Sequence, residues 1–106
     1  MFTDTCSIQN VTRDKQFGKV TVIKTSLPTP CRVEDEDLSE KNNEGSRSVY
    51  KRFYMLPPGT EIYKGDNIKT LTQRGVIITE TYFEVDQIFP VGGMSPHHME
   101  VTVSNV

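Results

Sequence analysis

The chain has 106 residues and a formal net charge of −2, with 12 Lys and Arg against 14 Asp and Glu. A chain of this length supports one modest core, so we expect a single domain over residues 1–106. The mixed charge argues against a protein whose main task is to neutralise phosphates, because duplex binding needs a clustered basic face.

The two cysteines, Cys6 and Cys31, are far apart in the chain. The sequence has no secretory signal pattern and no apolar run of membrane-spanning length, so we expect a protein folded in the cytosol, with buried, reduced thiols. Neither these cysteines nor the adjacent His97 and His98 have the spacing of a structural zinc site. We therefore expect no metal and no cofactor.

Short alternating runs of Thr, Val, Ile, Tyr and Phe, bounded by Gly, Pro and Asn, predict an all-β chain. We expect a small antiparallel barrel or sandwich of about seven short strands with a long polar loop. The predicted extended segments are 6–12, 19–25, 29–34, 48–55, 67–72, 76–89 and 98–103.

Alternation along these segments predicts which side chains face the core. On 48–55 both faces carry large residues, so both are expected to be partly covered, and Tyr54 and Tyr63 are expected to be exposed beside the following turn. The residues predicted to point inward are Val20, Val22, Phe53, Phe83, Val85 and Phe89. Cys6 and Ile8 are predicted to share one face of their strand, and Met99, Val101 and Val103 are predicted to share one face of the last strand.

Residues 34–47 are polar and contain one aliphatic residue, Leu38. Such a segment buries too little to order itself, so we expect a mobile acidic loop with at most a short helical turn near 38–41. A calcium loop is the alternative, but residues 34–45 do not provide the alternating ligand order that an EF-hand requires.

Two turns follow the strongest strand. Pro57 and Pro58 fix φ and remove amide donors, and Gly59 can adopt a positive φ. Gly65 and Asp66 predict a second tight turn. These residues indicate a corner of a barrel, with a structural rather than a chemical role.

The sequence contains no complete motif for catalysis. His97, His98 and Glu100 include possible acid–base groups, but no nucleophile motif accompanies them, and the glycine turns do not match a phosphate-binding loop. An aromatic stacking platform, as in oligonucleotide-binding barrels, is a further alternative that the negative net charge weakens. We therefore expect a non-enzymatic protein.

Three stretches carry a family resemblance. These are a strand at 29–34 that leads into the variable polar segment, a strand ending in the Leu-Pro-Pro-Gly-Thr-Glu-Ile corner and a Gly-Asp-Asn-Ile turn within 49–68, and a final strand pair, 82–85 and 97–101, around a Gly/Pro loop at 90–96. Over residues 19–106 the chain resembles the small head-completion proteins of tailed bacteriophages, the head–tail connector or stopper family.

The resemblance implies a structural virion protein, assembled in the host cytoplasm, whose homo-oligomeric ring lies at the head–tail interface. Its implied partners are further copies of itself, portal and adaptor proteins, and tail proteins, with packaged DNA nearby in the channel and no membrane. A tail-terminator or tail-tube subunit, and a small binding barrel of the oligonucleotide-binding or SH3-like kind, are the alternatives.

Two segments become interface candidates under this resemblance. The polar segment is the candidate for ordering against a neighbour or lining the channel, and the Gly/Pro loop is the candidate for docking. The channel candidates are Glu34, Asp35, Glu36, Asp37, Leu38 and Glu44. The docking candidates are Val91, Met94, His97 and His98.

Overall fold

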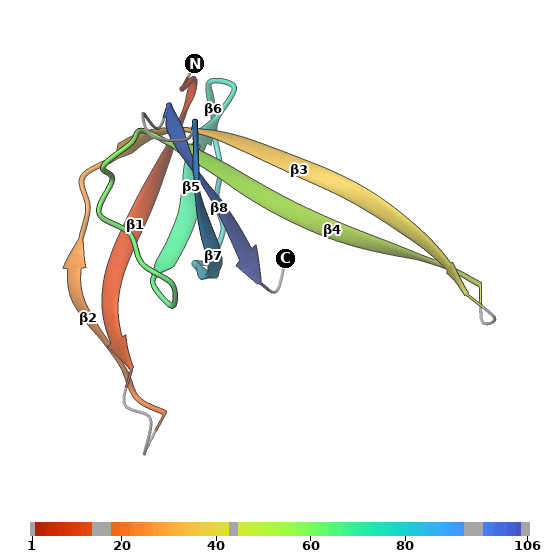
Figure 1. Ribbon diagram of the computed structural model, residues 1–106, viewed down its shortest axis with the longest axis horizontal. Coiled ribbons are helices and arrows are strands. Elements are labelled where there is room, and N and C mark those ends of the chain that lie inside the picture. Colours follow the sequence, from red (N-terminus) through yellow and green to blue (C-terminus); the bar gives the residue numbers. More distant parts are fainter. Residues whose placement is uncertain (1, 14–17, 43–44, 93–96, 105–106) are drawn as a thin grey trace.

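The computed structural model describes residues 2–13, 18–42, 45–92 and 97–104, with side chains for the same ranges except 36–42 and 45–50. The chain is all-β, as the sequence predicted (Figure 1). The described residues form eight strands, where about seven were expected, and two of them are long. They are β1 (Asp4–Arg13), β2 (Val20–Thr25), β3 (Thr29–Asn42), β4 (Gly45–Leu56), β5 (Asn67–Gln73), β6 (Val76–Ile77), β7 (Phe83–Val91) and β8 (His98–Ser104).

Six of the strands close into an antiparallel barrel. Their order is β1-β3-β4-β8-β7-β5, and β5 returns to pair with β1. The two remaining strands are additions to the sheet, since β2 pairs only with β1 and β6 pairs only with β5. Closure removes free edges from the barrel itself. Among the described strands, free edges therefore occur on the added strands and where one strand extends beyond the end of its hydrogen-bonded neighbour.

β1 belongs to both the barrel and a projecting ribbon. One edge of β1 pairs with β5, while the other edge pairs first with β3 at 4–6 and then with β2 at 9–13. We call residues 9–13 of β1 together with β2 the β1–β2 ribbon. Val20 and Val22 were predicted to point inward, and this was wrong: they are 41% and 46% exposed. β2 lies outside the barrel, so neither of its faces meets the core.

The third strand does not end near residue 34. β3 continues to Asn42 and pairs residue by residue with β4 from Arg32↔Met55 to Asn42↔Gly45. The polar segment predicted to be a loop, with a possible helical turn, is therefore a long β-hairpin that projects from the barrel (Figure 1). The backbone ladder satisfies its own hydrogen bonds, so this pairing does not require apolar side chains.

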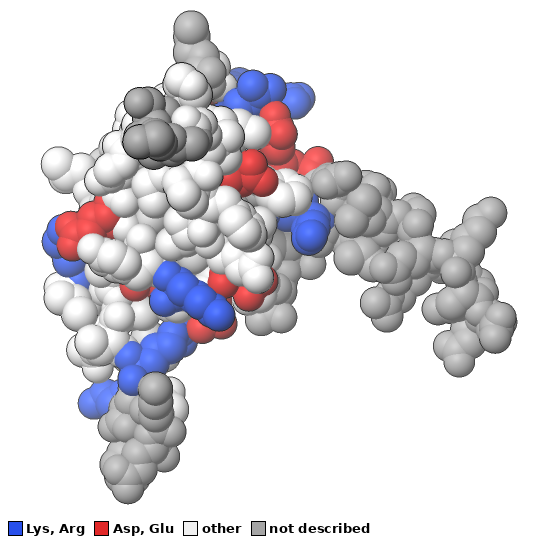
Figure 2. Space-filling view, in the orientation of Figure 1, with Lys and Arg blue, Asp and Glu red and all other residues white. Residues whose placement is uncertain are grey.

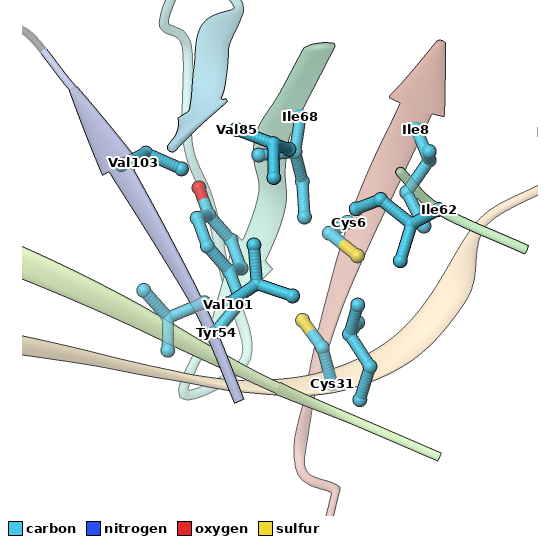
Figure 3. Close-up of a cluster of buried hydrophobic side chains, with 11 residues drawn as sticks. Cys6, Ile8, Cys31, Tyr54, Ile62, Ile68, Val85, Val101 and Val103 are labelled. Atoms are coloured by element: carbon cyan, nitrogen blue, oxygen red, sulfur yellow. The ribbon is translucent and has the colours of Figure 1, made fainter. Parts of the chain in front are cut away.

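The core lies inside the barrel (Figure 3). Cys6 and Cys31 are buried and free, and a hydrogen bond to Cys6, together with burial, raises the pKa of the Cys31 thiol. Met99 packs against the core from the same face of β8 as Val101 and Val103, and the sequence predicted that these three share a face. The buried apolar residues are Cys6, Ile8, Cys31, Val33, Tyr54, Leu56, Ile62, Ile68, Val85, Val101 and Val103.

Three aromatic predictions were wrong. Phe53 was predicted to face the core, but it is only half-buried, because Tyr54 and Leu56 on the opposite face of β4 meet the core. Tyr54 is fully buried, because its hydroxyl hydrogen-bonds with Thr70 Oγ1 at 2.9 Å and so satisfies its polar end inside the barrel. Phe89 is 46% exposed, because a bulge between Val85 and Gln87 shifts the alternation of β7 by one residue. Ile88 takes the core-facing position instead.

The extended segment predicted over 76–89 is divided. β6 has only two residues, and β7 begins at Phe83. Arg74 and Gly75 both have positive φ, at 52° and 79°, in the turn between β5 and β6. Two such residues characterise the type I′ turn that matches the twist of a hairpin.

The decrease in the free energy of unfolding at alkaline pH tests the burial of Tyr54. Burial raises the pKa of Tyr54 despite the Thr70 hydrogen bond, so the unfolded chain releases the proton at a lower pH than the folded chain. The unfolded state then binds fewer protons, and this contribution to stability is lost as pH rises above about 10. Tyr54→Phe should unfold more easily at neutral pH, by about 1 kcal/mol, but lose less stability on going to alkaline pH, as measured by urea unfolding.

The matched control is Tyr63→Phe, because Tyr63 is exposed. That variant should follow the pH dependence of the unmodified protein. An alkaline loss in Tyr54→Phe equal to that of the unmodified protein would contradict the assignment.

Candidate assembly surfaces

Asp66 anchors the β1–β2 ribbon at its base. Its buried carboxylate accepts hydrogen bonds from Asn10 Nδ2 at 2.7 Å, from the Tyr63 backbone N–H at 2.9 Å and from the Val11 backbone N–H at 3.2 Å. Val11 follows the register shift in the β1–β2 pairing. The carboxylate therefore supplies an acceptor where the regular ladder is interrupted.

Arg13 joins the same base from the surface. Its Nε and Nη2 donate to the Gly65 carbonyl at 3.0 and 2.7 Å, and Nη2 also forms an ion pair with Glu84 at 3.1 Å. A second exposed ion pair, Lys24 to Glu61 at 2.6 Å, connects β2 to the segment before the Gly-Asp turn. The ribbon is thus tied to the barrel through both of its strands.

Arg52 lies where the β3–β4 hairpin leaves the barrel. Its Nε lies 2.7 Å from Asp35 Oδ1, and its Nη1 lies 2.8 Å from Glu80 Oε2. Glu80 also accepts the Thr70 backbone N–H at 2.7 Å. Burial alone would lower the pKa of Arg52, but the hydrogen bonds to Asp35 and Glu80 outweigh it, so the pKa lies above its ordinary value and the guanidinium stays charged.

Asp4 is a second carboxylate anchor near the base of the β3–β4 hairpin. It is buried, and its carboxylate accepts the Val33 backbone N–H and the Arg74 backbone N–H, each at 2.9 Å. One side chain therefore joins the start of β1 to β3 and to the turn between β5 and β6.

A shallow, open depression of about 730 Å³ lies beside Asp4 at the base of the hairpin. Its charged groups are partly neutralised, because Glu34 pairs with Arg32 at 3.0 Å and Asp35 with Arg52. Small-molecule sites are usually more enclosed and more apolar. The lining residues are Thr3, Asp4, Arg32, Val33, Glu34, Asp35, Phe53, Gln73 and Arg74.

Charged side chains gather where the two projecting elements leave the barrel, and much of the face between them is uncharged (Figure 2). The bases of the β1–β2 ribbon and of the β3–β4 hairpin are therefore polar and internally paired. This arrangement orients both projections relative to the barrel.

The channel candidates are spread along β3 instead of sharing a loop. Glu34 and Asp35 lie at the base of the hairpin. Glu36, Asp37 and Leu38 lie further along β3, opposite Lys51, Tyr50 and Val49 in the backbone register. Glu44 lies outside the described residues.

The docking candidates lie near the end of the final strand pair. Val91 ends β7 and pairs with His98, and the His97 backbone N–H donates to the Val91 carbonyl at 2.8 Å. His97 is exposed and His98 is half-buried. Met94 lies outside the described residues.

The two predicted turns lie on either side of the buried Ile62. In the first, Thr60 donates its backbone N–H to the carbonyl of Pro57 at 3.3 Å, Pro58 follows Pro57, and Gly59 has φ of 82°. In the second, Asp66 donates its N–H to the Tyr63 carbonyl and Gly65 has φ of 92°. A glycine with positive φ at the third position characterises a type II turn.

Sequence reasoning missed the anchoring roles of Asp4, Asn10, Arg52 and Glu80. One signal was present for the first two, because they continue the alternation that places Cys6 and Ile8 in the core. A polar residue at a core-facing position implies a buried hydrogen-bond partner. Arg52 and Glu80 are distant in sequence, so only the fold brings them together.

Comparison with known proteins gives no match to a family model and no similar curated protein. Among the described residues, no helix has the length and apolar composition needed to cross a membrane. Over the same residues, no group of three or more His, Cys, Asp or Glu side chains has an arrangement that could hold a metal ion.

Replacing Asp66 tests the base of the ribbon. Asp66→Ala leaves Asn10 and two backbone N–H groups without their acceptor, so the free energy of unfolding should fall by about 3 kcal/mol in urea titrations. Asp66→Asn keeps one acceptor oxygen and should cost clearly less. Equal losses in the two variants would show that the hydrogen bonds to this side chain do not stabilise the fold.

Proposed function

We propose that the protein is a head-completion, or stopper, subunit of a tailed bacteriophage. In this role it is a structural, non-enzymatic virion protein, assembled in the host cytoplasm, whose ring joins the portal–adaptor complex to the tail and retains packaged DNA. The observation that carries the proposal is a closed barrel from which a long hairpin projects at the position of the family's variable polar segment.

A ring subunit needs a rigid body together with elements that reach beyond it. The barrel and its carboxylate anchors supply the rigid body. The β3–β4 hairpin supplies the reach, since it continues for many residue pairs past the last contact of β4 with β8 at Phe53. Its charge also suits a channel lining.

Residues 34–47 contain six acidic residues against Lys41 and Arg47. Excess negative charge repels phosphates, so DNA would not adhere to a channel lined by this segment. The hairpin therefore fits a gate or a lining better than a nucleic-acid grip. The burial of Tyr54 inside the barrel also removes one member of the alternative stacking platform.

Shortening the hairpin without changing its register tests this role. Deleting 38–41 together with 46–49 removes four facing residue pairs and brings Asn42↔Gly45 next to Asp37↔Tyr50. Because four is even, the alternation of the ladder is preserved. The variant should fold as the full chain does but fail to support head completion in particles that otherwise lack the protein.

Electron microscopy of those particles gives the readout. We expect tailless heads that have lost their DNA. Infectious particles at normal yield would contradict the proposal, and DNA-filled heads with tails of abnormal length would instead indicate a tail-terminator or tail-tube subunit. Salt-sensitive nucleic-acid binding by the purified chain would favour a small binding barrel.

A further inference from the structure

The two strands added to the barrel each have one side without a neighbouring strand. Among the described strands, β2 and β6 stand at the two ends of the sheet order, and each pairs along one edge only. β2 lies on the outside of the molecule at the left of Figure 1, and β6 lies at the top. Each outer edge presents backbone donors and acceptors with which another strand can pair.

Both edges carry large apolar side chains in solvent. All six residues of β2 are exposed, and Ile23 and the neighbouring Leu27 are 66% and 85% exposed. On β6, Val76 and Ile77 are 60% and 80% exposed. β-branched residues in strands normally pack against neighbours, and a two-stranded ribbon alone is marginally stable in water.

The two edges belong to segments of opposite charge. Residues 18–33 contain Lys19, Lys24 and Arg32 and no acidic residue. Residues 75–92 contain Glu80, Glu84 and Asp86 and no Lys or Arg. Four of these six charges already form ion pairs within the subunit: Lys24 with Glu61, Arg32 with Glu34, Glu80 with Arg52 and Glu84 with Arg13. The remaining two, Lys19 and Asp86, have opposite signs, which favours contact between the two segments over contact of either segment with its own copy.

We propose that β2 of one copy of this chain pairs with β6 of a second copy, head to tail. Two different surfaces meet in such a contact, so repetition closes a ring when the rotation between copies permits it. This inference rests on the proposed function for the ring itself, and adds which surfaces join the subunits. It leaves the β3–β4 hairpin free for the channel.

The apolar area exposed on the two edges is small, so we expect weak binding between two isolated subunits and stronger association in a closed ring. From their exposed fractions, the apolar side chains at 20, 22, 23, 27, 76 and 77 present on the order of 600 Å², against roughly 1,600 Å² buried in a specific interface of standard size. In a closed ring every subunit makes two such contacts at once, and the contact that closes the ring is intramolecular. We therefore expect association that rises steeply with protein concentration.

Directed cross-linking tests the pairing. Ile23→Cys and Ile77→Cys place reactive thiols on the two edges, while Cys6 and Cys31 are buried and the unmodified chain serves as the control. With a short bismaleimide at high protein concentration, an equal mixture of the two single variants should give cross-linked dimers. The double variant should give a ladder of higher species.

Two cross-linking results would overturn the proposal. Dimers from Ile23→Cys alone would show that β2 pairs with β2 of its partner, a two-fold contact that does not extend into a ring. No cross-linked species from the mixture or the double variant would show that the two edges do not meet.

Charge substitution provides a second, independent measurement. Ile77→Lys should weaken self-association roughly tenfold or more in sedimentation experiments, because it places an unpaired charge in an apolar contact. Phe89→Lys is the matched control, since Phe89 is an exposed apolar residue on β7, and it should associate as the unmodified chain does. Equal association of Ile77→Lys and the unmodified chain would also overturn the proposal.

The two proposals fail separately. Cross-links between β2 and β6 in a protein whose removal leaves heads full and infectious would support the pairing and refute the head-completion role. Heads that lose DNA without the protein, combined with absent cross-links, would support the role and refute the pairing.

Discussion

Buried backbone N–H groups at the ends of strand ladders are the constraint on which this fold depends. Strands leave, bulge or break at several places in the barrel, and each break removes carbonyl acceptors from a water-poor environment. Asp4, Asp66 and Glu80 replace them by accepting the backbone N–H groups of Val33, Arg74, Val11, Tyr63 and Thr70. Among the described residues no buried side-chain polar atom lacks a hydrogen-bond partner. A small apolar core is therefore accompanied by buried carboxylates, which give hydrogen-bond acceptors to backbone N–H groups that the strand ladders leave without one.

The same carboxylates determine how the projecting elements leave the barrel. Asp66 and Arg13 hold the β1–β2 ribbon at its base, and Arg52 connects the base of the β3–β4 hairpin to Glu80 and so to β5. Arg52 also stacks over the Phe83 ring, with its guanidinium carbon 5.2 Å from the ring centre. A small barrel with two oriented projections and free strand edges is suited to the proposed assembly, because contacts with neighbours would occur away from the core and would not disturb it.

Much of the fold could be predicted from local patterns. The alternating runs identified most strands, and the faces of β1 and β8 were correct at Cys6, Ile8, Met99, Val101 and Val103. The errors share a cause, which is that alternation groups side chains by face without indicating what covers the face. Val20 and Val22 share a face that no strand covers, Tyr54 is buried because Thr70 meets its hydroxyl, and the β7 bulge exposes Phe89. For the candidate surfaces, the sequence located the polar segment but not its pairing with β4, because a polar strand has no apolar periodicity to reveal it.

The sequence by itself determined the all-β class, the positions of most strands, and the corner at Pro57 to Asp66. These depend on local properties: β-branched alternation, the fixed φ of proline and the positive φ available to glycine. Only the tertiary structure decided that β1 divides its edge between β3 and β2, that residues 34–42 pair with 45–53 in a hairpin, and that Arg52 meets Asp35 and Glu80. These features depend on which distant segments become neighbours when the barrel closes, and local periodicity does not encode that choice.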